Sequence, residues 1–226
     1  MDVIYIKKKE WIYITLIVIF SIICGVVTKD YIIGTIILLS GLLNSYLASL
    51  GKVENYIFGA LYSLFVAYVS YINGLYGLAM LSVFVYIPLQ IRGFISWKKS
   101  MNKEKNNEEV IVRGFTLKFS LLLTFIVVAL SFLFGYLLNL IPSQNLAFLD
   151  SSSNIINLSA VVLMNLRYKE CWMIWLFNNT IDLIIWIINT VKGTPNCVMM
   201  LLVSIGFLSI NVYGLYKWIK MERKNK

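Results

Sequence analysis

One apolar stretch near the C-terminal end, residues 171–191, combines indole, amide and carboxylate side chains. Trp172, Trp175, Asn179, Asp182 and Trp186 follow one another at intervals of three and four residues. At 3.6 residues per turn, this spacing places all five on one face of a helix. Indoles can stack on a ring, while amide and carboxylate groups can bond ring amides or ribose hydroxyls. The pattern therefore indicates a binding face for a flat, polar small molecule.

Neighbouring apolar stretches offer polar groups that could complete this face. Tyr86 and Gln90 lie four residues apart on one side of a helix, and Pro88 between them indicates a kink or a freed carbonyl. The further candidates for substrate binding are Tyr62, Asn178 and Asn211. The alternative is that these groups hydrogen-bond between packed helices, with tryptophans at the membrane interface, and Trp172 fits either role. For Pro88, a simple packing kink is an equal alternative.

Several kinds of chemistry have no residues to perform them. The chain has no histidine, which excludes histidine-based zinc sites, general bases and proton relays. Its three cysteines, Cys24, Cys171 and Cys197, stand at unrelated spacings and are expected to be buried, inert thiols. We therefore expect no metal site, no cofactor and no enzymatic activity.

The composition is that of an integral membrane protein. Of 226 residues, 59% are hydrophobic and 14% are charged, whereas soluble domains have about 25% charged residues. One core and one surface cannot accommodate so many apolar side chains. The composition excludes a soluble enzyme, a nucleic-acid-binding protein and a disordered scaffold.

The sequence contains eight apolar stretches of membrane-spanning character, because a bilayer core of ~30 Å needs about 20 helical residues. They are residues 11–28, 31–50, 53–72, 75–97, 117–141, 153–166, 171–191 and 196–218. We expect the first to be a retained helix rather than a cleaved signal, because no small-residue cleavage pattern follows it. The sixth is the shortest and starts within a polar run, residues 150–154. Asp182 is the only acidic residue well inside a predicted span.

The basic residues indicate the orientation. If the N-terminus is cytoplasmic and eight spans alternate, 18 of the 20 lysines and arginines fall on the cytoplasmic side. Only Lys29 and Lys192 fall outside. Because basic residues concentrate in cytoplasmic loops, this division predicts a multi-pass protein of the plasma membrane with both termini inside. The longest loop, residues 98–118, is expected to be a solvated linker.

The chain also contains an internal repeat. An amide, a glycine three residues on and a tryptophan seven residues on recur as Gln90, Gly93 and Trp97 and as Asn211, Gly214 and Trp218. Four spans separate the two copies, so both cross the membrane in the same direction, as parallel repeats with a substrate site near the midplane. We predict an all-α transmembrane fold of eight helices, in which one extra helix precedes a 3+1+3 repeat. The expected divisions are 1–30, 31–99, 100–150, 151–220 and 221–226: tail and extra helix, first repeat, loop and linking helix, second repeat, and tail.

Sequence motifs in both halves resemble the Pnu family of bacterial vitamin transporters. In the first half they are ENYIFG (54–59), YINGLYG (71–77) and PLQIRGFISWKK (88–99). In the second half they are RYKE (167–170), WLFNN (175–179) and NVYGLYKW (211–218). The resemblance extends over most of the chain, and its motifs are moderately specific when taken together.

This resemblance implies several properties beyond the residues themselves. It implies a SWEET-like fold, a homotrimer, and facilitated uptake of nicotinamide riboside, with intracellular phosphorylation trapping the substrate. The Trp-x-x-x-Asn pattern of the family's ligand site maps onto Trp175 and Asn179, and its fourth-span amide maps onto Gln90. Other branches resemble this chain but take thiamine, riboflavin or deoxynucleosides. Asp182 departs from the nicotinamide riboside branch and leaves the substrate open among these.

We therefore expect a uniporter that works by alternating access. Its partners are a small vitamin or nucleoside and the lipid bilayer, with no nucleic acid. The alternatives are a membrane-embedded enzyme, a non-transporting membrane subunit and an ion channel. The enzyme has few candidate groups, because a single deep carboxylate provides no acid–base pair. The channel lacks a visible ring of charged residues.

Overall fold

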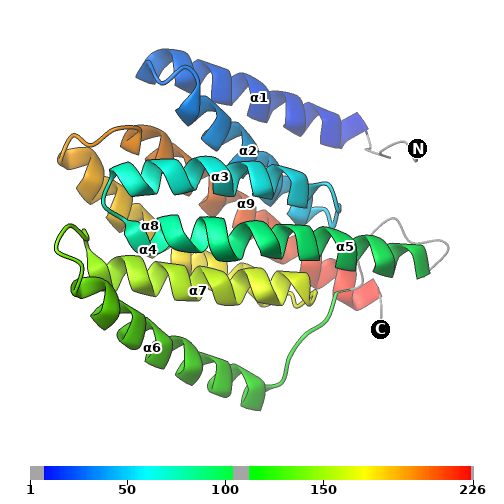
Figure 1. Ribbon diagram of the computed structural model, residues 1–226. Coiled ribbons are helices and arrows are strands. Elements are labelled where there is room, and N and C mark those ends of the chain that lie inside the picture. The colour runs from blue at the N-terminus through cyan, green and yellow to red at the C-terminus, as the bar shows by residue number, and fades with distance from the viewer. Residues whose placement is uncertain (1–7, 104–111, 225–226) are drawn as a thin grey trace.

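The described part of the chain, residues 8–103 and 112–224 of a computed structural model, is a bundle of long helices (Figure 1). An isolated bridge between Arg113 and Tyr168 is the only strand-like pairing within these residues. The elements are α1 (Lys8–Thr28), α2 (Ile33–Ser49), α3 (Asn55–Ile72), α4 (Tyr76–Leu81), η1 (Ser82–Tyr86), α5 (Ile87–Lys103), α6 (Leu117–Asn139), α7 (Ala147–Asn165), α8 (Cys171–Val191) and α9 (Cys197–Lys224). Because α4, η1 and α5 follow without a break, they form one span.

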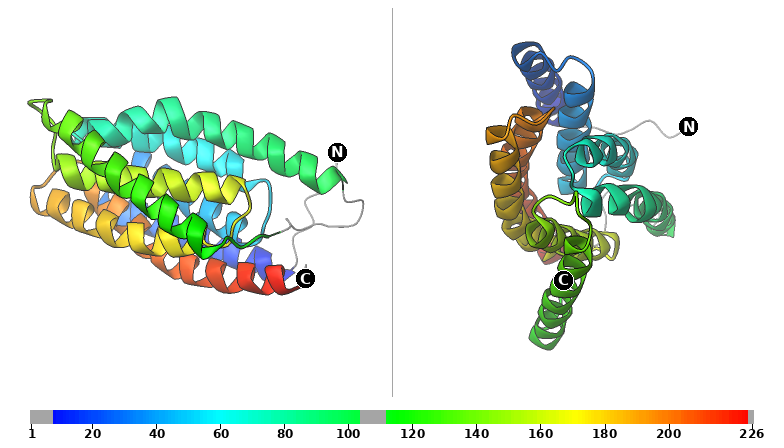
Figure 2. Two further views of the ribbon diagram at one scale, coloured as in Figure 1. Left: turned by 90° about the horizontal axis from the view of Figure 1, so that it is seen from below. Right: turned by 60° about the vertical axis from the view of Figure 1, so that its left-hand side comes forward.

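The described bundle therefore consists of eight spans, as the sequence predicts. Seven are long and apolar enough to cross a membrane. The eighth, α2, has 17 residues, or about 26 Å at 1.5 Å per residue. It is also the most enclosed, with Ile37 and Leu38 fully buried. By contrast, α1 and α6 lie at opposite edges of the molecule and expose apolar side chains, as expected of helices that face lipid (Figure 2).

The predicted repeat is present in three dimensions. One set of three spans, α2, α3 and α4–η1–α5, corresponds to α7, α8 and α9, and α6 links the two sets. The second span of each set ends at a glycine with φ of +69°, Gly74 in one and Gly193 in the other. Each glycine donates its N–H to a carbonyl three residues earlier, Tyr71 or Thr190. Glycine adopts this left-handed conformation without a steric penalty, so both copies make the same turn.

Two apolar clusters fill the ends of the bundle. Along α9, Met199 belongs to the first cluster and Trp218 to the second. The two residues stand 19 positions apart in the sequence. The second cluster lies at the end that carries most of the basic residues, and Trp97, Trp172 and Trp218 are all fully buried in it. The indole centre of Trp218 lies 6.0 Å from that of Trp97 and 5.7 Å from that of Trp172. Between the two clusters, α9 passes a region that side chains do not fill.

The structure corrects the start of the sixth span. The sequence places it at Ser153, but α7 begins at Ala147, so Asp150 lies inside a membrane helix. Asp150 nevertheless lies in the first turn of α7, so among the described residues Asp182 remains the acidic residue that lies well inside a span. The polar run stays helical because its groups find partners: Asp150 accepts hydrogen bonds from Gln144 Nε2 (2.8 Å) and the Gly77 N–H (3.2 Å). Ser151 Oγ likewise donates to the Ser131 carbonyl at 2.6 Å.

The fourth span is interrupted where Pro88 indicates it. The interruption is the five-residue π-helical segment η1, immediately before the proline-containing first turn of α5. A π-helical segment bonds each residue to the fifth one along and so turns the side chains relative to a regular α-helix. Within η1, Ser82 and Tyr86 are buried, whereas Phe84 is 75% exposed. The segment therefore directs two polar side chains toward the interior.

Candidate functional site

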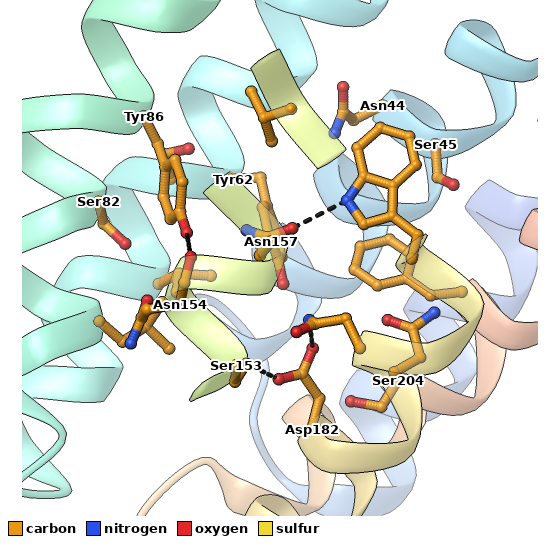
Figure 3. Close-up of a pocket in the computed structure, with 18 of the residues that line it drawn as sticks. Asn44, Ser45, Tyr62, Ser82, Tyr86, Ser153, Asn154, Asn157, Asp182 and Ser204 are labelled. Atoms are coloured by element: carbon orange, nitrogen blue, oxygen red, sulfur yellow. Dashed lines mark hydrogen bonds between the residues drawn. The ribbon is translucent and has the colours of Figure 1, made fainter. Parts of the chain in front are cut away.

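A cavity lies in the middle of the bundle, between the two apolar clusters. Its volume is about 110 Å³. Along α9 it is lined by Ser204, Phe207 and Asn211, which lie between Met199 and Trp218 in sequence. Both repeats contribute to its wall, through α2, α3 and α4–η1–α5 on one side and α7, α8 and α9 on the other (Figure 3). This is the midplane position that parallel repeats predict.

The cavity brings together nine of the ten residues that the sequence nominates. They are Tyr62, Tyr86, Gln90, Trp175, Asn178, Asn179, Asp182, Trp186 and Asn211. The tenth, Trp172, does not line it. This indole is fully buried in the tryptophan cluster and contacts Trp218 and Trp175. Any side chain at Gly214 would collide with its ring, so Trp172 packs the bundle one turn below the cavity.

Helix α8 positions the central carboxylate. Asp182 lines the cavity and accepts hydrogen bonds from Ser153 Oγ of α7 and from Asn178 Nδ2, the latter at 2.8 Å. Figure 3 shows Ser153 and Asp182 pointing toward each other across the two helices. Both bonds come from neutral donors. Because no lysine or arginine lines the cavity, the carboxylate has no basic partner among the lining residues.

Helix α7 orients two of the aromatic side chains. Asn157 Oδ1 accepts a hydrogen bond of 2.9 Å from Trp175 Nε1, and the Asn154 carbonyl accepts one of 3.0 Å from the Tyr86 hydroxyl. On the opposite side, Tyr62 and Phe207 meet edge to face, with ring centres 5.7 Å apart. Aromatic rings that are fixed in this way present flat surfaces to a ligand without further loss of side-chain entropy.

Several buried polar atoms in the wall have no hydrogen-bond partner in the structure. They are Asn44 Oδ1, Ser82 Oγ, Gln90 Oε1, Asn154 Oδ1, Asn178 Oδ1 and Asn179 Nδ2. A buried polar group without a partner costs about 1–3 kcal/mol. Such groups are kept in a membrane protein where they face a cavity with a hydrophilic occupant. The wall is therefore matched to a ligand with several hydrogen-bonding groups of its own.

The charge of the cavity wall disfavours anionic ligands. Asp182 is the only ionisable acid or base on its described wall, apart from the tyrosine hydroxyls, and no lysine or arginine lines it. Phosphate recognition relies on arginine, lysine or a helix N-terminus, and the cavity lies along the middle of its helices. The site therefore suits a cation or a neutral polar molecule and disfavours a phosphorylated one.

The sequence did not identify the contributions of α2 and α7. Asn44 and Ser45 on α2, and Ser153, Asn154 and Asn157 on α7, also line the cavity. Asn157 is a single amide within an apolar stretch, so its cost within a membrane was the available signal. Asn154 and Ser153 belonged to a polar run that was interpreted as the boundary of a span. Within the described residues, no group of histidine, cysteine, aspartate or glutamate side chains could hold a metal ion.

Known proteins match the chain along most of its length. Residues 31–220 match the family model described as nicotinamide mononucleotide transporter. A Neisseria mucosa protein named nicotinamide riboside transporter PnuC is 31% identical over 203 residues, 88% of this chain and 76% of the relative. A Haemophilus influenzae protein of the same name is 29% identical over 218 residues, 96% and 92% of the two chains. A crystal structure described as the vitamin B3 transporter PnuC superposes with a TM-score of 0.85 at 27% identity, and the match includes 98% of this chain and 94% of that one.

Proposed function

Because this chain belongs to the nicotinamide mononucleotide transporter family, we propose that it carries nicotinamide riboside, or a closely related vitamin or nucleoside, across a bacterial plasma membrane. Relatives at 29% and 31% identity are named as nicotinamide riboside transporters. The observation that carries the proposal is the cavity wall, which combines unpartnered buried amides with one carboxylate and no basic side chain.

Nicotinamide riboside has groups that match this wall. Its pyridinium ring is cationic and flat, its carboxamide both donates and accepts hydrogen bonds, and its ribose has three hydroxyls. In the proposed complex, Trp175 stacks on the ring and Asp182 neutralises its charge, while Trp186, eleven residues further along α8, lines another part of the cavity. Asn179, Gln90 and Asn211 bond the carboxamide and the ribose. Desolvation strengthens each of these contacts, because the cavity lies between two apolar clusters.

The same charge pattern supports a trapping mechanism. Once an intracellular kinase adds a phosphate to the ribose, the product has an anionic phosphate with up to two negative charges, and this group meets no basic side chain in the described cavity wall. The phosphorylated form would therefore not leave by the route through which the nucleoside entered. This makes net uptake by a uniporter feasible without ATP or an ion gradient at the transporter itself.

Transport requires the site to open and close. A volume of about 110 Å³ is below the ~300–1,000 Å³ of typical ligand pockets, so the two repeats must separate to admit a nucleoside. Contacts join them at both ends. Asn73 Nδ2 donates to the Pro195 carbonyl at 3.2 Å near one end, and the Tyr56 hydroxyl donates to Asn165 Oδ1 at 2.8 Å near the other. Alternating access then consists of releasing one set of contacts at a time while the repeats rock about the cavity.

Asp182 favours a second candidate, thiamine, because a carboxylate also suits a cationic thiazolium ring. Uptake of labelled nicotinamide riboside, thiamine, riboflavin and deoxynucleosides into proteoliposomes distinguishes these substrates. We expect saturable uptake of nicotinamide riboside, no uptake of its phosphorylated form, and loss of uptake in a Trp175→Ala, Asn179→Ala double variant. Absence of saturable uptake of all four classes, together with co-purification of a fixed partner, would instead identify a non-transporting subunit.

The proposal includes a homotrimeric assembly, which the family resemblance implies. The apolar exposed faces of α1 and α6 provide surface for contacts between subunits. Mass measurement of the purified chain in detergent or in nanodiscs tests this assembly. A monomer at all protein concentrations would contradict the trimer and leave the transport proposal unaffected, because the described cavity is complete within one chain.

A further inference from the structure

A groove lies on the outside of the first repeat, between α3 and α5. It is lined by Tyr56, Ile57, Ala60, Ile91, Phe94 and Ile95, with Gln90 as a further lining residue, and has a volume of about 240 Å³. Ile57, Ile91 and Ile95 are each 58–61% exposed, so the groove opens away from the bundle. Both helices belong to membrane spans, and the open side therefore faces lipid.

One end of the groove is basic. Ile91 lies three residues before Phe94 and four before Ile95, and Lys98 lies four and three residues after them, so they follow one face of α5 toward its C-terminal end. Lys98 Nζ lies 5.6 Å from the centre of the Phe94 ring, which places the ammonium group beside a side chain of the groove wall. The exposed Lys99 adds a second positive charge next to it.

We propose that this groove binds one anionic glycerophospholipid, with an acyl chain along the apolar wall and the phosphate at Lys98. An acyl chain is the matching occupant because the wall offers almost no hydrogen-bonding atoms and opens into the bilayer. An anionic headgroup is the matching end because basic side chains beside a membrane span attract anionic lipids. The apolar wall and the basic residues follow each other along α5. Their order matches that of the acyl chain and the headgroup in a phospholipid.

The groove and the cavity share one residue. Gln90 lines both of them, and it is only 6% exposed, with its Oε1 unpartnered. Gly59 permits this position, because a side chain there would come within 2.6 Å of Gln90 Oε1. An acyl chain packed over the outer side of Gln90 holds its amide toward the cavity. Bound lipid should therefore raise substrate affinity, a consequence that rests on the proposed function, whereas the lipid site itself does not.

The test measures lipid retention by the full-length protein, without substrate. Native mass spectrometry after exchange into phosphatidylglycerol or phosphatidylcholine should show selective retention of the anionic lipid. Lys98→Gln should weaken that retention about fivefold, as expected for one basic residue at a membrane surface, while Lys220→Gln, at the same end of the bundle on α9, should not. Ala60→Phe, which fills the groove, should also reduce retention, whereas Ala129→Phe on the exposed face of α6 should leave it unchanged.

Equal retention of the two lipids, or equal behaviour of Lys98→Gln and Lys220→Gln, would overturn the proposal. If Ala60→Phe fails to fold, the lysine pair still decides the outcome, because both lysines are exposed and neither substitution disturbs the core. Substrate titrations in nanodiscs of each lipid then test the link to Gln90. Selective lipid retention without a change in substrate affinity would refute that link alone.

Discussion

At the scale of single residues, the cavity is defined by polar atoms that the protein leaves without partners. Gln90 and Asn44 have unpartnered oxygens on one side of it, and Asn178 and Asn179 have unpartnered amide atoms on the other. In a folded core such atoms only reduce stability. Their presence around one small volume supports our proposal of a ligand site over ordinary hydrogen bonding between helices, the alternative interpretation of the sequence.

Asp182 should determine the preference for cationic substrates. Replacing it by asparagine keeps the shape of the side chain and removes its charge, so binding of nicotinamide riboside and thiamine should weaken about tenfold to a hundredfold, the range for a charged hydrogen bond. Binding of a neutral deoxynucleoside should change much less. Quenching of tryptophan fluorescence measures both affinities, since Trp175 and Trp186 line the cavity. An equal loss for charged and neutral ligands would contradict this role.

Asn179→Ala should lower substrate affinity by about 1–3 kcal/mol and leave thermal stability almost unchanged. Its Nδ2 atom has no partner in the unliganded protein, so the substitution removes a contact that only the substrate completes. Asn157→Ala is the matched comparison, because Asn157 already accepts a hydrogen bond from Trp175 and its loss should affect the melting temperature as well. Melting curves and titrations of both variants provide the comparison.

The spacing of residues along α8 predicted four of the side chains that line the cavity. A repeat of three and four residues identifies a face, and that face is the one that meets the cavity. The spacing contains no information on depth, however, and Trp172 on the same face lies in the tryptophan cluster. Isolated polar residues such as Asn44 and Asn157 have no pattern at all, so only the packed structure assigns them to the wall.

At the scale of elements, η1 turns the fourth span toward the cavity. Ser82 and Tyr86, the first and last residues of η1, both line it. The proline-containing turn of α5 follows directly. The sequence indicated an interruption through Pro88 but could not specify a π-helical segment, because that geometry depends on the helices packed around it. The start of α7 was likewise unpredictable, since the partners of Asp150 come from distant parts of the chain.

Deleting Phe84 should abolish transport while the protein still inserts and folds. The deletion removes the extra residue of the π-helical turn, so Ser82 and Tyr86 come to stand three residues apart and the wide turn between them is lost. Phe84 is 75% exposed, so no core contact is lost. Phe84→Ala is the control and should transport normally. Proteoliposome uptake and size-exclusion profiles of both variants decide the matter, and uptake by the deletion variant would refute a positioning role for η1.

Asp150→Ala should destabilise the protein by about 1–3 kcal/mol, because three hydrogen-bond donors lose their acceptor: the Gly77 N–H, Gln144 Nε2 and Asn154 Nδ2. The Gly77 bond joins the first turn of α4 to α7, and the other two hold the first turn of α7 and the loop before it. The melting temperature in detergent measures the effect. A melting temperature equal to that of the unaltered protein would show that the contacts contribute nothing to stability.

At the scale of the whole molecule, two like-oriented halves are closed at both ends around one cavity. The sequence predicted the spans and the repeat because bilayer thickness and helix periodicity constrain both directly. It could not predict that both ends are joined at once, because those contacts pair residues far apart in the chain, such as Asn73 with Pro195 and Tyr56 with Asn165.

The orientation can be tested with cysteines, because Cys24, Cys171 and Cys197 are all buried and free. In intact cells, Lys192→Cys should react with an impermeant maleimide, whereas Lys220→Cys should react only after permeabilisation. The unaltered protein provides the blank. The reverse pattern would place both termini outside the cell and contradict the distribution of basic residues.

The equivalence of the two halves has a consequence for how a cargo can sit between them. Tyr86 and Phe207 each stand four residues before the matching amides Gln90 and Asn211, and all four line the cavity. In an ancestor assembled from two identical halves, an asymmetric substrate could have bound in two opposite orientations of equal energy. Divergence after duplication places a phenol on one side and a phenyl ring on the other. The two orientations then differ in energy, so one of them is preferred.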